Sequence, residues 1–172
     1  MFSGQNAYLS IKKKEILYSH KLKRKSKLTL SSNLLTPMEL ENADEIKVYY
    51  ESSTPYEIFV MDLSGDIVYP DSSFQIKLLE NNIIVKGDAQ TFYDTTYIWA
   101  YPIKMSLPKE GNIVAGPYLL QPYLIPYNNE MQLNIALESV HSLMNLGIYY
   151  YDQNKLEWNY LPSQLTVDSM FM

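Results

Sequence analysis

Hydrophobic residues in this chain come in short runs, often alternating with polar residues. Tyr, Ile, Val and Thr dominate the runs, and Gly, Pro, Asn, Asp and Ser separate them, which is typical of strands joined by turns. We therefore predict a series of β-strands over residues 15–23, 27–31, 45–51, 56–63, 66–69, 74–79, 82–86, 95–104, 116–124, 131–137, 146–152, 157–161 and 165–171.

Helical patterns are short, and turn-forming residues are frequent. The segments 62–66, 80–82 and 152–155 contain Asp, Asn or Gly in positions that suit tight turns. Only 36–43, which starts with Thr-Pro, and 137–145 resemble helices. The absence of long helices between the strands predicts an all-β fold of two antiparallel, immunoglobulin-like β-sandwich units with few or no helices.

The length of 172 residues permits one core or two small ones, because folding at this size hides roughly 70% of the exposed surface. We place a domain boundary near Asp88. Residues 1–87 then form an N-terminal β-rich domain, and residues 88–172 form a C-terminal sandwich.

The stretch FYDTTYIWAYP, from Phe92 to Pro102, is unusually rich in aromatic residues. Strand alternation sends Tyr97, Trp99 and Tyr101 to one face and the small or aliphatic residues between them to the other. Such a row can form a platform for sugar rings, or it can fill a core with its polar tips reaching water. We favour the core, since an exposed row of this size promotes association.

A second aromatic group lies in the last two predicted hairpin strands. If these side chains are exposed, they can stack on sugar rings, as in a carbohydrate-binding module. The candidate ligand contacts are Tyr149, Tyr151, Trp158 and Tyr160.

Composition narrows the class of protein. Hydrophobic residues make up 47% of the chain and charged residues 19%, which is too apolar for a disordered chain. No apolar run reaches the roughly 18 residues of a membrane-spanning helix, so we expect no membrane insertion. The chain contains no cysteine, which excludes disulfides and thiolate sites. No secretory signal precedes the first predicted strand, so an export signal, if one exists, is expected outside this sequence.

Positive charge is concentrated at the N-terminus. Residues 1–28 carry eight cationic side chains against one carboxylate, Glu15, while the remaining residues are strongly acidic. The alternation of Lys21, Lys23, Lys25 and Lys27 predicts one lysine-bearing strand face, a common guard against edge-to-edge association. We expect no nucleic-acid partner, because the acidic remainder repels polyanions.

Motifs for catalysis are missing. His20 and His141 each lack a second histidine or a carboxylate at ligand spacing, and neither a phosphate loop nor a nucleophile elbow is present. Asp62, Asp66 and Asp71 cluster around a predicted turn without the spacing of a calcium loop. We assign no catalytic residue, no cofactor and no metal site.

The second half of the chain resembles a known group of sandwich domains. Three segments carry the resemblance: AQTFYDTTYIWAYP, GPYLLQPYLIPYNNEMQLNI and GIYYYDQNKLEWNYL. They are similar in order and pattern to ZU5-like and related immunoglobulin-type sandwiches, in particular to the non-catalytic region that follows the zinc domain of large lysostaphin-like (LytM-type) cell-wall metallopeptidases. The terminal SMFM resembles the opening of the last strand of that region.

This chain also departs from that family pattern. Gln90 and Thr91 replace a small Gly-Ala pair, Gln121 replaces the glycine before Pro122, and the last strand is truncated. The zinc-binding HxxxD and HxH motifs are absent, so the resemblance transfers no catalytic residue. It implies a fragment that acts as an accessory region in the cell envelope or outside the cell.

Two functions are therefore expected. The first is a non-catalytic accessory module whose partners are other domains of the same polypeptide and peptidoglycan or another glycan, with end loops at 122–130 and 152–156 making contacts. The second is a carbohydrate-binding module that uses the Tyr and Trp side chains of the last hairpin.

Overall fold

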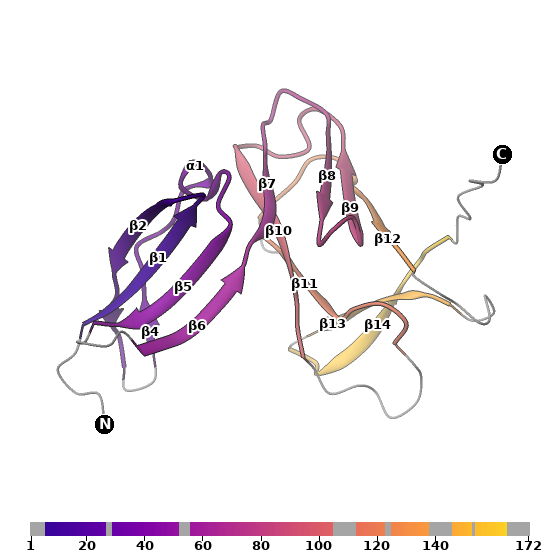
Figure 1. Ribbon diagram of the computed structural model, residues 1–172. Coiled ribbons are helices and arrows are strands. Elements are labelled where there is room, and N and C mark those ends of the chain that lie inside the picture. The colour runs from indigo at the N-terminus through magenta and orange to yellow at the C-terminus, as the bar shows by residue number, and fades with distance from the viewer. Residues whose placement is uncertain are drawn as a thin grey trace. The chain divides into compact units, whose positions relative to one another are not determined.

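The computed structural model describes residues 6–26, 29–51, 56–104, 113–122, 125–137, 146–152 and 154–164. Within these ranges the chain forms fourteen strands and one short helix (Figure 1). Every strand pairing is antiparallel. The predicted all-β fold is confirmed, whereas the immunoglobulin-like arrangement of sheets stays a prediction.

The chain divides into two compact units. Met1–Lys104 and Gly116–Ala136 form the first, and Met105–Ala115 and Leu137–Met172 form the second. This division does not coincide with the boundary expected near Asp88, because strands on both sides of that residue pair with one another. As a statement about independently folding domains, the boundary stays a prediction.

A four-stranded sheet opens the first unit. Its strands are β1 (Ala7–Lys13), β2 (Ile16–Lys21), β5 (Glu45–Tyr50) and β6 (Tyr56–Asp62), in the order β2-β1-β5-β6. Strand β1 is absent from the predicted strands, although Leu9 and Ile11 show the alternation of a half-buried strand. The polar residues around them hid the signal, and pairing with two neighbours stabilises the strand.

The expected run of lysines on one strand face is wrong. Strand β2 ends at Lys21, and the N–H of Leu22 donates to the carbonyl of Ala7 at 2.8 Å. The chain then forms the short pair β3 (Lys23–Arg24) and β4 (Leu30–Ser31), with the Lys25 N–H bonded to the carbonyl of Thr29 at 3.0 Å. This turn interrupts the alternation, and Lys27 lies outside the described residues.

The helix α1 (Pro37–Leu40) confirms the start predicted at Thr36, although it is shorter than the expected 36–43. The Thr36 hydroxyl accepts from the Glu39 N–H at 3.3 Å, and a Glu39 carboxylate oxygen accepts from the Thr36 N–H at 2.8 Å. This reciprocal capping box satisfies two otherwise unpaired donors. Residues 138–145, most of the second expected helix, lie outside the described residues.

One residue, Leu63, separates β6 from β7 (Ser64–Val68). The prediction of a turn over 62–66 is therefore wrong, because most of that segment belongs to the two strands. By contrast, the turn expected at 80–82 is confirmed, with the Asn82 N–H bonded to the carbonyl of Leu79 at 3.0 Å. The chain thus passes almost directly from one sheet into the next.

Two three-stranded sheets complete the strands of the first unit. One has the order β11 (Tyr118–Gln121), β10 (Thr96–Pro102), β7; the other has the order β12 (Gln132–Ile135), β9 (Ile83–Gly87), β8 (Phe74–Leu78). Both sheets contribute to one hydrophobic cluster, which contains Val68, Ile76, Leu78, Ile83, Val85, Phe92, Ile98 and Ala100.

The two faces of β10 pack as the alternation predicted. Ile98 and Ala100 belong to the cluster just described. On the other face, Trp99 and Tyr101 pack against a second cluster, formed by Ile11, Ala43, Ile46 and Met61. The core interpretation of this aromatic strand is confirmed.

The start of β10 is fixed by a local hydrogen bond. The Thr96 hydroxyl donates to the carbonyl of Asp94 at 2.9 Å. Gly65, directly opposite Trp99 on β7, permits the close approach of the two strands. A Cβ atom at this position would lie 2.7 Å from the Trp99 Cβ and from the ring of Tyr97.

Two strands of the second unit are described, β13 (Ile148–Asp152) and β14 (Glu157–Leu161), and they form a hairpin. No described helix, in either unit, has the length and apolar surface needed to cross a membrane.

Candidate functional site

The hairpin β13–β14 is shaped by its turn. The carboxylate of Asp152 accepts from the N–H of Asn154 at 2.9 Å and from the N–H of Lys155 at 3.2 Å. Leu156 then adopts a φ of 57°, which returns the chain to pairing. These side-chain to backbone bonds fix the register, and they confirm the turn predicted over 152–155.

This register brings all four predicted ligand contacts together. Tyr149 lies opposite Tyr160, and Tyr151 lies opposite Trp158. Residues that face one another across an antiparallel pair, and residues two apart along a strand, share a face of the sheet. Tyr149, Tyr151, Trp158 and Tyr160 therefore form one surface, which we call the aromatic face.

The rings touch in two cross-strand pairs. The centroids of Tyr149 and Tyr160 are 5.5 Å apart with an interplanar angle of 63°, and those of Tyr151 and Trp158 are 5.4 Å apart at 57°. Edge-to-face contacts of this kind are favourable because the positive edge of one ring meets the negative face of the other. The aromatic face is thus a ridged surface of tilted rings rather than a flat platform.

Exposure is graded along the aromatic face. Tyr149 and Tyr160 are 54% and 53% exposed, whereas Tyr151 and Trp158 are half-buried. The rings of Tyr149 and Tyr160 are therefore the more open to solvent. Tyr150 is also exposed but points to the opposite side of the hairpin, across from Asn159.

Gly147 lets the outer pair sit close to the backbone. A Cβ atom on Gly147 would lie 2.7 Å from Cε2 of Tyr160 and 3.3 Å from Cε2 of Tyr149. Any larger residue would move the Tyr160 ring, since a Cβ atom does not tolerate a neighbour at that distance. The position of the outer rings therefore depends on this glycine.

The chemistry available on the aromatic face is stacking and hydrogen bonding. Its three phenols each offer a donor and an acceptor, and the Trp158 indole offers a donor. At the turn of the same hairpin, Lys155 Nζ lies 3.8 Å from a carboxylate oxygen of the exposed Glu157. These groups can stack on an apolar ring and form hydrogen bonds beside it.

The end loops expected to make contacts are partly described. In 122–130, Asn128 and Asn129 donate through their side-chain amides to the carbonyls of Gln90 and Ala89 at 3.1 Å and 3.2 Å. These bonds hold the loop against the segment before β10. The other loop, 152–156, is the hairpin turn described above.

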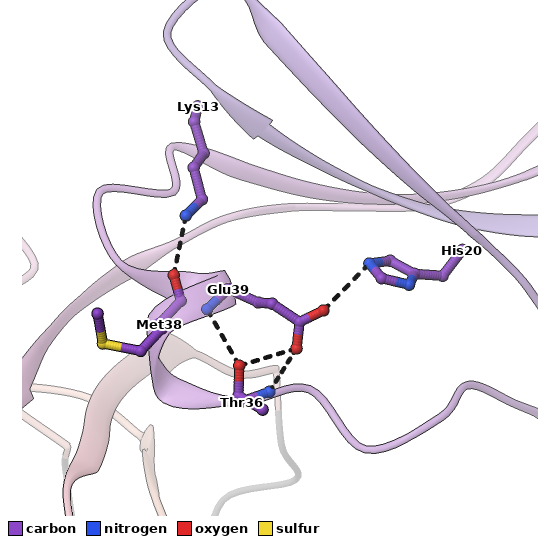
Figure 2. Close-up of polar contacts among 5 residues, drawn as sticks. All are labelled: Lys13, His20, Thr36, Met38 and Glu39. Carbon is purple, nitrogen blue, oxygen red and sulfur yellow. Dashed lines mark hydrogen bonds and ion pairs between the residues drawn. The ribbon is translucent and has the colours of Figure 1, made fainter.

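A polar cluster at α1 is the second candidate (Figure 2). The His20 Nε2 atom lies 3.7 Å from a carboxylate oxygen of Glu39, whose other oxygen accepts from the Thr36 hydroxyl at 2.9 Å. The Lys13 ammonium donates to the carbonyl of Met38 at 3.1 Å. The sequence pattern does not predict this cluster, because it depends on the pairing of β1 with β2.

This polar cluster acts as a helix cap. The pKa of Glu39 is lowered, first by the hydrogen bonds from the Thr36 backbone and hydroxyl and then by the nearby His20 and Lys13. A hydroxyl becomes a nucleophile when a base lies within hydrogen-bond reach. Here the Thr36 hydroxyl donates to one oxygen of the Glu39 carboxylate, and the His20 imidazole contacts the other oxygen of that carboxylate. The contacts in this cluster are therefore those of a helix cap.

A shallow pocket of about 290 Å³ is the third candidate, and it lies just below the usual range for small-molecule sites. Its lining residues are Asp62, Leu63, Ser64, Leu79, Glu80, Tyr101 and Pro102. No three His, Cys, Asp or Glu side chains among the described residues are grouped to hold a metal ion. His141 lies outside those residues.

Comparisons with known proteins add no relative. No model of a protein family matches the chain, and neither does any curated protein or any solved structure.

Proposed function

We propose that this chain is a non-catalytic, all-β binding module of a cell-envelope or secreted protein, and that it holds a glycan on the aromatic face. The observation that supports this function is that four aromatic residues share one side of β13–β14, where Tyr149 and Tyr160 are exposed. This arrangement favours the carbohydrate-binding alternative, in which these four residues contact the ligand, over binding by the end loops.

The chemistry of the aromatic face matches a sugar. A pyranose ring has an apolar face of C–H groups and a rim of hydroxyls, so it needs an apolar surface beside donors and acceptors. Tyr and Trp offer both, since their rings are apolar and their O–H or N–H groups are polar. Core aromatics such as Tyr97 are buried, whereas Tyr149 and Tyr160 keep about half of their surface open.

The remaining parts of the proposal, namely the fold type, the neighbouring domains and the identity of the glycan, rest on the sequence resemblance. In this proposal the sandwich is immunoglobulin-like, the other domains of the polypeptide include a zinc peptidase, and the glycan is peptidoglycan. The aromatic face neither requires nor opposes that association, because it acts through surface complementarity.

Tryptophan emission tests the proposal. The chain has two tryptophans, so Trp99→Phe leaves Trp158 as the reporter on the aromatic face. We expect saturable changes in its emission when soluble peptidoglycan fragments or chito-oligosaccharides are added. Tyr160→Ala should weaken this binding by about tenfold or more, as truncation of an aromatic anchor does.

Tyr150→Ala is the matched control, because it removes the same kind of side chain from the opposite side of the same hairpin. It should leave binding unchanged. A chain that responds to no glycan, or that loses affinity equally in the Tyr150 and Tyr160 variants, contradicts the proposed function.

A further inference from the structure

Strand β2 is an edge of the four-stranded sheet, opposite the edge formed by β6 (Figure 1). Among the residues that the structure describes, β1 is the one strand that pairs with it. An edge strand leaves the N–H and C=O groups of every second residue unpaired, and such a row can accept a further strand.

The direction of these groups follows from the turn between β1 and β2. Lys13 and Ile16 flank a two-residue turn, so their backbone groups form hydrogen bonds with each other. Along the two strands, hydrogen-bonded pairs then alternate with pairs whose backbone groups point away from each other. The outward-pointing backbone groups on β2 are therefore those of Leu17, Ser19 and Lys21.

The first half of β2 is apolar and open on both faces. Ile16, Leu17 and Tyr18 are 59%, 58% and 47% exposed, although neighbouring residues of a strand point to opposite sides. Between Ile16 and His20 the strand has no lysine, arginine or proline, the residues that usually protect an edge.

The opposite edge is protected. The register of β6 against β5 shifts between Val48 and Tyr49, and such an irregularity makes an edge harder to extend. Strand β6 also carries Glu57, whose carboxylate lies 2.8 Å from Lys47 Nζ, and Asp62 at its end. The two edges of one sheet therefore differ in their readiness to accept a strand.

Positive charge flanks the open edge. Residues 12–25 contain one carboxylate, that of Glu15. A second carboxylate, that of Glu39 on α1, lies beside His20. The cationic side chains in this stretch are Lys12, Lys13, Lys14, Lys21, Lys23, Arg24 and Lys25. A second copy of this chain fits less well than an acidic segment, because each copy brings the same excess of cationic residues over 12–25 to the shared edge.

We propose that the outer edge of β2 binds an extended acidic segment of a partner protein by strand addition. The backbone groups of Leu17, Ser19 and Lys21 provide the hydrogen bonds, Ile16 to Tyr18 provide apolar contact, and the lysines at both ends select acidic residues. This surface is separate from the aromatic face and does not depend on glycan binding.

Two short, end-capped peptides test the inference with the full chain. Both alternate valine with threonine; one has a glutamate at each end and the other a lysine. We expect the acidic peptide to bind about tenfold more tightly, with weaker binding at high salt. The amide signals of Leu17, Ser19 and Lys21 should shift most in nuclear magnetic resonance spectra.

Leu17→Glu places a carboxylate at the centre of the edge and should weaken binding of the acidic peptide by about tenfold. Val60→Glu is the matched control, because Val60 is an exposed apolar residue on β6, at the other edge of the sheet. It should leave binding unchanged.

Three results overturn the inference: no binding of the acidic peptide, equal binding of both peptides, or equal loss in the two variants. A dimer of the chain that Leu17→Glu dissociates, with no peptide bound, also overturns it, since the edge then serves a second copy.

Discussion

At the scale of single residues, burial decides what a tyrosine does. Tyr97 and Tyr160 have the same side chain and similar strand settings, yet one is buried in β10 and the other is half exposed on the aromatic face. Burial raises the pKa of Tyr97 to about 12, and the nearby Asp66 adds to the rise. Tyr97 is thus a structural phenol whose proton is held to higher pH in the folded unit than in the unfolded chain.

Stability should fall at alkaline pH because of Tyr97. Its ordinary pKa is 10.0, so above that value the unfolded chain loses the proton first. The stabilisation is complete below pH 10 and is lost as the pH rises towards 12, by about 1 to 2 kcal/mol. Urea unfolding at pH 8 and near pH 11 measures this loss in the wild type.

Tyr97→Phe serves as the control for this pH dependence. The variant lacks the phenol, so its free energy of unfolding should fall less between the two pH values than that of the wild type. Equal falls in the two proteins contradict the assignment of this titration to Tyr97.

At the scale of elements, β10 contributes to two hydrophobic clusters at once. Ile98 and Ala100 pack in one, and Trp99 and Tyr101 pack against the other. This double role explains why a run of aromatic residues appears in one short strand. The strand also pairs with β7 on one side and β11 on the other, so its loss would disturb both clusters.

Trp99→Ala should lower the free energy of unfolding by about 3 kcal/mol, at the low end of the range for a large aromatic residue because Trp99 is half-buried. Urea unfolding followed by circular dichroism measures the change. Tyr93→Ala, at an exposed aromatic residue just before β10, should stay within about 0.5 kcal/mol of the wild type. A Trp99→Ala protein of full stability that had lost only ligand binding would contradict the core assignment.

At the scale of the whole molecule, the chain consists of two compact units with one tryptophan in each. Trp99 lies in the first unit and Trp158 in the second. The described strands of the second unit form a single two-stranded hairpin, and hairpins of this kind have little stability of their own.

The two units should therefore unfold in separate transitions. In a Trp158→Phe protein the emission reports on Trp99, and in a Trp99→Phe protein it reports on Trp158. We expect the Trp158 signal to change at lower urea concentration than the Trp99 signal, because local stability differs between units. Coincident transitions in the two proteins would show one cooperative unit instead.

The sequence alone determined the kind of structure and the identity of the candidate contacts. Period-two patterns and turn residues predicted most strands, the Thr-Pro pair at 36–37 predicted the start of the helix, and the aromatic alternation of β10 predicted its two faces. These features depend on neighbours within a few residues, which the sequence displays directly.

Tertiary structure decided the rest. The expected turn at 62–66 became a passage between sheets, β1 formed because two strands flank it, and the lysine run broke at a turn. The pairing of β13 with β14 decided that four separated aromatic residues share one face. Strand pairing joins residues far apart in the chain, so its register and its open edges depend on contacts that local patterns do not contain.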